Sequence, residues 1–229
     1  MPKLKNQNRK KEIKILEKLL EIIYPPMCSI CGAPSKQYLC NKCEKKLNQI
    51  EIIPSNVHLV SDTKMTKCIH AFMYEGVIRD LILQYKFDYK PYIYRTFITF
   101  FKKNKKIYSL FRNYDIIVPV PISKKRWKNR GYNQSALLAK ELAKIYNLKY
   151  DDTALIKIKN NPKQSTLNQE ERIQNVKNVY KIKNNVNIIN KNVLLVDDVY
   201  TTGATCGECA KILEDSGAKF VGVFTIAKD

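Results

Sequence analysis

VLLVDDVYTTGAT, residues 193–205, consists of an apolar run, two adjacent carboxylates and a turn rich in threonine and glycine. The four apolar residues at 193–196 are typical of a buried parallel strand. Asp197 and Asp198 follow at its carboxyl end, where the ligand crevice of an open α/β sheet lies. We therefore expect these two acids to face a ligand rather than the core.

The turn after these acids contains residues suited to binding an anion: Thr201, Thr202, Gly203, Ala204 and Thr205. It opens a predicted helix that ends near Asp215. Backbone N–H groups, the helix dipole and hydroxyls converge there, and Gly203 permits close approach. Carboxylates for sugar hydroxyls beside a phosphate cradle indicate a ribose 5-phosphate ligand. The alternative is an ordinary strand, turn and helix with solvated acids. The spacing excludes a Walker A loop and a dinucleotide fingerprint.

A second apolar run, DIIVPVP at 115–121, predicts another buried strand that ends in a rigid turn. The basic stretch KKRWKNR at 124–130 separates this strand from a predicted helix over 136–146. Guanidinium and backbone N–H groups in such a loop suit a diphosphate, which carries more charge than one helix terminus balances. A solvated basic loop is the alternative. The acidic motif elsewhere in the chain favours the diphosphate interpretation.

The stretch at 193–205 resembles the phosphoribosyl pyrophosphate (PRPP) motif of type I phosphoribosyltransferases. VPVP, RWKNRGYNQ and LLVDDVYTTGAT follow a four-cysteine cluster in this order, and together they resemble the competence protein F (ComF) family. That family comprises phosphoribosyltransferase-like proteins associated with natural transformation. The resemblance extends over about residues 25–227, with further matches at Tyr74-x-Gly76, Lys86, Gln164 and Arg172-x-x-Asn175-Val176.

The resemblance implies an α/β fold of the type I phosphoribosyltransferase kind, with a parallel sheet flanked by helices. It also implies that Asp197 and Asp198 hold the ribose 2′- and 3′-hydroxyls of PRPP, while residues 201–205 wrap its 5′-phosphate. Mg²⁺ would bridge the pyrophosphate and the ribose hydroxyls, because it prefers phosphate oxygens and waters to many protein ligands.

Phosphoribosyl transfer passes through an oxocarbenium-like state, in which charge stabilisation and positioning dominate. Arg126 and Arg130 would neutralise the departing pyrophosphate. Family analogy makes residues 160–178 a flap over PRPP, in which Lys163 would close the site. The alternative for this stretch is a surface loop with a short helix.

Four cysteines near the N-terminus have the spacing C-x2-C-x8-C-x2-C, namely Cys28, Cys31, Cys40 and Cys43. Two such pairs fit four thiolates around a tetrahedral zinc ion. Four thiolate ligands leave no open position for water, so the zinc is expected to be structural. Two disulfides and an iron–sulfur cluster are the alternatives. Disulfides are disfavoured because nothing upstream resembles a secretory signal.

The chain has 229 residues, 45% of them hydrophobic, enough for one sizeable core and a small appendage. No apolar run reaches membrane-spanning length, and we expect a cytoplasmic protein without a transmembrane segment. We divide it into a basic N-terminal helix at 1–24, a zinc module at 25–46, a basic and aromatic segment at 47–110, and a phosphoribosyltransferase-like core at 111–229.

Four stretches are expected to form the parallel sheet of this core, at 115–120, 155–158, 193–196 and 220–226. Any hood over an acceptor is expected from the region before Asp115, because the last predicted strand is followed directly by Asp229. This would put the zinc module and the 47–110 segment beside C1′ of the ribose.

The formal charge of +20 is unevenly distributed. Residues 115–192 contain 16 Lys and Arg against 6 Asp and Glu, whereas residues 193–229 contain 3 against 6. Aromatic residues are interspersed with the basic ones, as in YKFDYKPYIYRTFITFFKKNKK at 85–106. A basic surface with exposed rings suits single-stranded nucleic acid. An A/T-rich genome also encodes many lysines, and both explanations stay open.

Two functions follow from these patterns. The first is a Mg²⁺-dependent phosphoribosyltransferase that acts in competence and DNA uptake on an unidentified acceptor. The second is a non-catalytic accessory that binds single-stranded DNA and works with the competence machinery, with PRPP as a regulatory or structural ligand.

Overall fold

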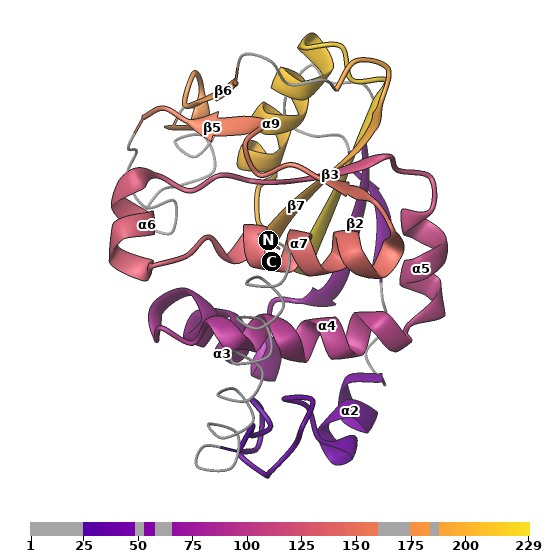
Figure 1. Ribbon diagram of the computed structural model, residues 1–229, viewed down its shortest axis with the longest axis vertical. Helices are drawn as coiled ribbons and strands as arrows, with labels where there is room; N and C mark the ends of the chain where they lie inside the picture. Colours follow the sequence, from indigo (N-terminus) through magenta and orange to yellow (C-terminus); the bar gives the residue numbers. More distant parts are fainter. Residues whose placement is uncertain (1–24, 49–52, 58–65, 160–174, 184–187) are drawn as a thin grey trace, which may run out of the picture.

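A computed structural model describes residues 25–48, 53–57, 66–159, 175–183 and 188–229 (Figure 1). Its main sheet has the strand order β1-β2-β8-β7-β3-β4. These strands are β1 (Ile53–Val57), β2 (Thr66–Met73), β8 (Phe220–Lys228), β7 (Asn192–Tyr200), β3 (Ile116–Pro119) and β4 (Lys149–Tyr150). β1 is antiparallel to β2, and the other neighbouring strands are parallel.

Helices connect and cover the strands. They are α2 (Asn41–Asn48), α3 (Gly76–Phe87), α4 (Tyr94–Lys103), α5 (Lys105–Phe111), α6 (Lys124–Arg130), α7 (Gln134–Tyr146) and α9 (Ala204–Asp215), with a 3-10 turn, η1 (Pro91–Ile93), before α4. Within the described ranges, no helix is long and apolar enough to cross a membrane.

The two faces of β7 belong to different layers of the core. Leu194 and Val196 pack with buried residues of α3, α4, α5 and α7, whereas Val193 and Leu195 pack with buried residues of α9. All four side chains are fully buried. This alternation is that of a strand with a period of two, and the sheet therefore lies between two layers (Figure 1). The α/β fold with a parallel sheet flanked by helices is confirmed.

The register places the two predicted sequence motifs at one edge of the sheet. Pro119 of β3 pairs with Val196 of β7, directly before Asp197. Because parallel strands end on the same side, the chain after β3 and the acids of β7 meet there.

The expectation for 155–158 was wrong. β5 (Leu155–Lys157) pairs antiparallel with β6 (Tyr180–Ile182) in a separate two-stranded sheet. β4 occupies the sheet position beside β3 instead. The buried Leu155 packs in the α9 layer, so its apolar character reflects burial under a second sheet rather than membership of the first. In the segment 47–110, β2 pairs in parallel with β8.

The basic stretch 124–130 is also helical rather than a loop. Ser123 caps α6 because its Oγ accepts a hydrogen bond from the N–H of Arg126 at 3.2 Å. Gly131 ends the helix in the left-handed conformation, with φ of 80°. A second cap follows at Asn133, whose side chain accepts from the N–H of Ser135 and starts α7.

Candidate functional site

A cavity of about 690 Å³ lies beyond the carboxyl ends of β3 and β7. Both predicted acids and most of the predicted phosphate loop line it, namely Asp197, Asp198, Thr201, Gly203, Ala204 and Thr205. Arg126 and Arg130 line the same cavity from α6. Two motifs that are far apart in the sequence therefore line the same cavity.

Asp197 uses one carboxylate oxygen to fix its position. Asp197 Oδ1 lies 2.9 Å from Ser135 Oγ and accepts a hydrogen bond from the N–H of Asp198 at 2.9 Å. Burial, followed by the negative charge of Asp198, raises the pKa of Asp197 to about 7, while the charge of Lys86 acts in the opposite direction. The buried carboxyl group of Asp197 is therefore easier to protonate than that of an exposed aspartate.

Asp198 is 4% exposed, and both of its carboxylate oxygens have partners. Lys86 Nζ lies 2.7 Å from Asp198 Oδ1, and Gln134 Nε2 donates to Asp198 Oδ2 at 2.6 Å. An ionised carboxylate offers about four acceptor positions, so these two bonds leave room for a ligand hydroxyl. Gln134 and the ion pair with Lys86 were not predicted, because they depend on how α3 and α7 pack on β7.

Within the phosphate loop, Gly203 is the N-cap of α9, with φ of 76°. Thr202 Oγ1 accepts a hydrogen bond from the N–H of Ala204 at 3.4 Å, so this side chain provides an acceptor for the first N–H of α9. The N–H groups of a first helical turn have no partners within the helix. Because Ala204 and Thr205 line the cavity, these donors and the positive end of the α9 dipole adjoin it.

Arg130 is held from two sides. Its Nη1 donates to Gln134 Oε1, and its guanidinium carbon lies 5.8 Å from the ring centroid of Phe87. Burial lowers the pKa of Arg130, an effect that the charge of Asp198 opposes. Arg126 is half-buried on the same helix. The pair can therefore present guanidinium groups to an anion in the cavity.

Lys157 and Tyr180 also line the cavity, from β5 and β6. Lys157 Nζ lies 3.4 Å from the hydroxyl of Tyr180 and 5.2 Å from its ring centroid. Burial, followed by the charge of Arg126, lowers the pKa of Lys157 to about 8. Sequence reasoning missed both residues because it assigned 155–158 to the main sheet. Lys163 and the greater part of the predicted flap, 160–174, lie outside the described residues.

The segment before residue 111 also lines the cavity, through Leu83, Lys86 and Phe87 of α3 and the following Tyr89. The zinc module, which was expected beside the ribose, packs instead on α4. Thr96 Oγ1 lies 2.8 Å from Ser29 Oγ, and Lys103 Nζ lies 2.8 Å from a carboxylate oxygen of Glu44. Leu39 of the module and Leu47 of α2 also belong to the same buried cluster as Phe97 of α4, so apolar burial and these polar contacts together explain the placement.

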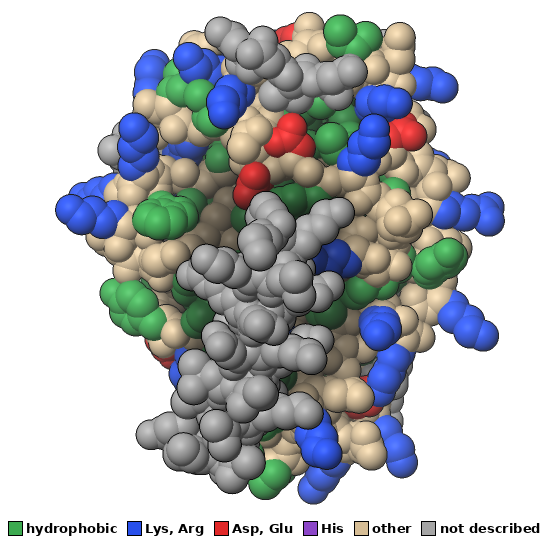
Figure 2. Space-filling model, viewed as in Figure 1, with side chains coloured by type: hydrophobic (Ala, Val, Ile, Leu, Met, Phe, Trp, Pro, Cys, Tyr) green, Lys and Arg blue, Asp and Glu red, His purple; other side chains and the backbone are tan. Residues whose placement is uncertain are grey.

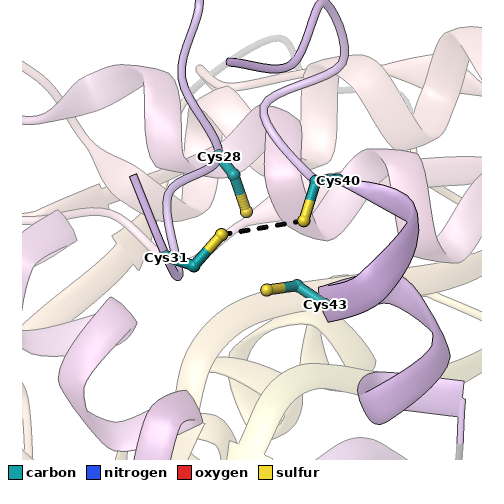
Figure 3. A group of neighbouring side chains, drawn as sticks. All are labelled: Cys28, Cys31, Cys40 and Cys43. Atoms are coloured by element: carbon teal, nitrogen blue, oxygen red, sulfur yellow. Dashed lines mark hydrogen bonds between the residues drawn. The ribbon is translucent and has the colours of Figure 1, made fainter. Parts of the chain in front are cut away.

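The four cysteines point toward one another at the start of α2 and in the loop before it (Figure 3). Their sulfur atoms all lie within 4.8 Å of one another, and Cys31 Sγ is 3.7 Å from Cys40 Sγ. A tetrahedron with zinc–sulfur bonds of about 2.3 Å has edges of about 3.8 Å, so the cluster fits zinc. Cys28 and Cys43 are buried, and a backbone bond from Gly32 N to Cys28 O closes the first knuckle. This arrangement supports a structural zinc site.

One face of the molecule carries many basic side chains. Figure 2 shows Lys and Arg side chains along both flanks of this face, where they outnumber the visible Asp and Glu side chains. Trp127 is 58% exposed on α6, next to the exposed Lys125 and Lys128. Aromatic and basic groups therefore share one short helix beside the cavity.

Two family models match the chain. A double zinc ribbon domain matches residues 19–53, and a phosphoribosyl transferase domain matches residues 132–229. The first match contains all four cysteines, and the second contains the acids, the phosphate loop and α9.

Curated relatives extend the likeness over most of the chain. It is 30% identical over 204 residues to competence protein ComFC of Streptococcus pneumoniae, covering 83% of this chain and 87% of that protein. ComFC of Bacillus subtilis is 29% identical over 205 residues, with coverages of 88% and 78%. DNA utilization protein YhgH of Escherichia coli is 33% identical over 114 residues, about half of each chain. The chain therefore belongs to the ComF family and has a phosphoribosyltransferase-like domain.

Proposed function

We propose that the protein binds PRPP with Mg²⁺ and transfers its phosphoribosyl group to an acceptor during the handling of DNA in natural competence. The observation that carries this proposal is the shared cavity, in which two adjacent carboxylates, a helix N-terminus and two arginines converge. The carboxylates suit sugar hydroxyls, the helix N-terminus suits a monophosphate, and the arginines suit a diphosphate. The names of the relatives, competence protein and DNA utilization protein, support the cellular role.

Each group has a defined task in the transfer. Asp197 and Asp198 accept hydrogen bonds from the ribose hydroxyls, and the N-terminus of α9 binds the 5′-phosphate through Thr201, Gly203 and Thr205. Arg126 and Arg130 stabilise the negative charge on pyrophosphate as the bond to C1′ breaks. Lys163 closes the flap over the bound substrate. No side chain has to act as a base, because charge stabilisation and positioning supply the catalysis.

The residues fit Mg²⁺ only in company with PRPP. Both oxygens of Asp198 already have protein partners, and one oxygen of Asp197 does too. Mg²⁺ requires six oxygen ligands, which the diphosphate, the ribose hydroxyls and waters would supply. When bound, the ion would neutralise charge on the departing pyrophosphate.

The experiment that tests this proposal is isothermal titration of the zinc-loaded protein with PRPP and Mg²⁺, alongside Asp198→Asn and the control Asp80→Asn. Asp80 is an exposed acid of α3, so its loss should leave binding unchanged. Binding by wild type and control only would support the site. Pyrophosphate release that depends on an added acceptor would then demonstrate transfer, whereas the absence of PRPP binding would overturn the proposal.

A second function is favoured by the exposed lysines and Trp127. In this alternative the protein binds single-stranded DNA as a competence accessory, with PRPP as a regulatory or structural ligand. Lysines neutralise phosphates, and an exposed indole stacks on bases. Binding of PRPP without acceptor-dependent pyrophosphate release, together with salt-sensitive DNA binding, would favour this alternative over transfer.

A further inference from the structure

The end of helix α3 reaches the ribose-binding acids through one ion pair. Lys86 Nζ lies 2.7 Å from Asp198 Oδ1, with side chains that are 20% and 6% exposed. Removal of one partner from a largely buried ion pair leaves an uncompensated charge, which is strongly destabilising. Lys86 therefore compensates the charge of Asp198 at a position where water contributes little.

The same carboxylate connects to the arginine expected to bind pyrophosphate. Gln134 Nε2 donates to Asp198 Oδ2 at 2.6 Å, while Gln134 Oε1 accepts from Arg130 Nη1. Gln134 is itself fixed, because its backbone carbonyl accepts a hydrogen bond from the hydroxyl of Tyr85 at 2.8 Å. Lys86, Asp198, Gln134 and Arg130 thus form one continuous chain of side-chain contacts from α3 across β7 to α7 and α6.

We propose that Lys86 is a positioning residue of the PRPP site, which holds the carboxylate of Asp198 oriented for the ribose hydroxyl. This inference rests on the proposed function. The ion pair and the bond from Gln134 occupy one position on each oxygen of Asp198, so the remaining acceptor positions are fixed in direction. Lys86 thereby gives the basic and aromatic segment before residue 111 a direct part in completing the site.

The local charges explain why a cation is needed at this position. Asp197 and Asp198 are adjacent and largely enclosed, and two such carboxylates tend to share a proton unless a positive charge is near. Titratable groups that interact electrostatically with Asp197 include Lys157 from β5, Tyr180 from β6, and Cys206 and Cys209 from α9. Those that interact with Asp198 include Tyr85 from α3, Arg130 from α6 and Cys206. Two of these groups are cationic. Lys157 lines the cavity from β5, and Arg130 connects to Asp198 through Gln134, whereas Lys86 contacts the carboxylate directly. Without Lys86, Asp198 would lose its partner on Oδ1.

The binding test uses three variants of the full-length, zinc-loaded protein: Lys86→Met, Lys86→Arg and Lys90→Met. Lys90 is the matched control, because it is near the end of the same helix but contacts Gln84 Oε1 at 2.9 Å instead of an acid. Titration with PRPP and Mg²⁺, and separately with ribose 5-phosphate, should show about 10- to 100-fold weaker binding for Lys86→Met, as expected for a lost charged hydrogen bond. Lys86→Arg should restore most of the affinity, and Lys90→Met should match wild type.

A stability cycle keeps the inference testable if Lys86→Met folds poorly. Asp198→Asn should lower the thermal midpoint in the wild-type background but raise it in the Lys86→Met background, because there it removes the unpaired charge. Equal effects in both backgrounds, or wild-type affinity in Lys86→Met, would overturn the positioning role alone. A wild-type protein that does not bind PRPP would overturn the proposed function, and the positioning role with it.

Discussion

A methyl group on Gly203 would lie 2.3 Å from the hydroxyl oxygen of Tyr200. Tyr200 is at the end of β7, and Gly203 is the residue that starts α9. The side chain of Tyr200 therefore fills the space beside Gly203, and no room is left there for a larger residue. Gly203 also has φ of 76°, where other residues are strained.

Gly203→Ala should weaken PRPP binding by at least about tenfold, because a shift of the loop moves the N–H donors that bind the phosphate. Isothermal titration with PRPP and Mg²⁺ measures this loss. Gly131→Ala is the matched control: Gly131 has φ of 80°, but a methyl group there would meet nothing within 4 Å. If both variants lose affinity equally, general backbone strain rather than the fit against Tyr200 would be the cause.

The raised pKa of Asp197 should make stability depend on pH. Between pH 4 and about 7, Asp197 is protonated in the folded protein but ionised in the unfolded chain. The folded state then binds more protons, so the contribution of this residue to stability should decrease as pH rises through this window and level off above about 7.

Thermal midpoints of wild type and Asp197→Asn between pH 4.5 and 8.5 test this expectation. The midpoint of the variant relative to wild type should increase with pH up to about 7, because asparagine is never ionised. Asp80→Asn, at an exposed site, should show a constant difference. A flat difference for Asp197→Asn as well would contradict the raised pKa.

Zinc removal should destabilise the protein while affecting the PRPP site little. Cys43 is buried in the cluster, which packs on α4 rather than at the cavity. Cys43→Ser should lose the one bound zinc ion and lower the thermal midpoint by roughly 10 °C, the effect of a few kcal/mol in a chain of this size. Metal analysis and thermal unfolding measure both.

The matched control for zinc is Cys68→Ala, because Cys68 is a buried cysteine in β2, away from the cluster. This variant should keep one zinc ion per chain. A cluster that retains zinc after Cys43→Ser would show that fewer than four thiolates suffice.

The lysines around α4 and α5 should contribute to DNA affinity if the accessory function operates. Lys102, Lys105 and Lys106 are exposed, whereas Lys103 pairs with Glu44. Their combined replacement by glutamate should weaken binding of single-stranded DNA and reduce the salt slope by up to about 2, since each phosphate contact contributes about 0.7. Fluorescence anisotropy at several salt concentrations measures both quantities.

Lys211→Glu with Lys219→Glu is the control for net charge, because both lysines are exposed in the acidic C-terminal part of the chain. This control replaces two lysines rather than three, so a loss about two-thirds as large as that of the triple variant would mean that overall charge, and not the α4–α5 surface, determines the affinity.

The motifs that were predicted from the sequence are those whose parts are adjacent along the chain. VLLVDDVYTTGAT contains its own strand, acids and helix start, so the positions of Asp197 and Gly203 followed from local rules. The cysteine pairs are equally local. Lys157 and Tyr180 carry no such signal, because only the packing of β5–β6 brings them to the cavity. Lys86 matches the family resemblance, but its contact with Asp198 depends on how α3 packs and was not predicted.

The errors have the same origin. Leu155 and its neighbours form an apolar run that would suit either sheet, and hydrophobic periodicity does not specify which partner a strand finds. The helix at 124–130 was not predicted, because its run of basic residues was interpreted as a loop. Ser123 before it and Gly131 after it are nevertheless typical helix-capping residues.

The pairing of β2 with β8 determines when the sheet can be completed during synthesis. His70 of β2 and Thr225 of β8 are 155 residues apart in the chain, yet His70 Nδ1 lies 2.8 Å from Thr225 Oγ1 in the fold. Until residues 220–228 leave the ribosome, β2 has no parallel neighbour and one edge of it stays open to other chains. We therefore expect slow closure of the sheet, governed by contacts between distant parts of the chain, and a need for protection of the nascent first half from aggregation.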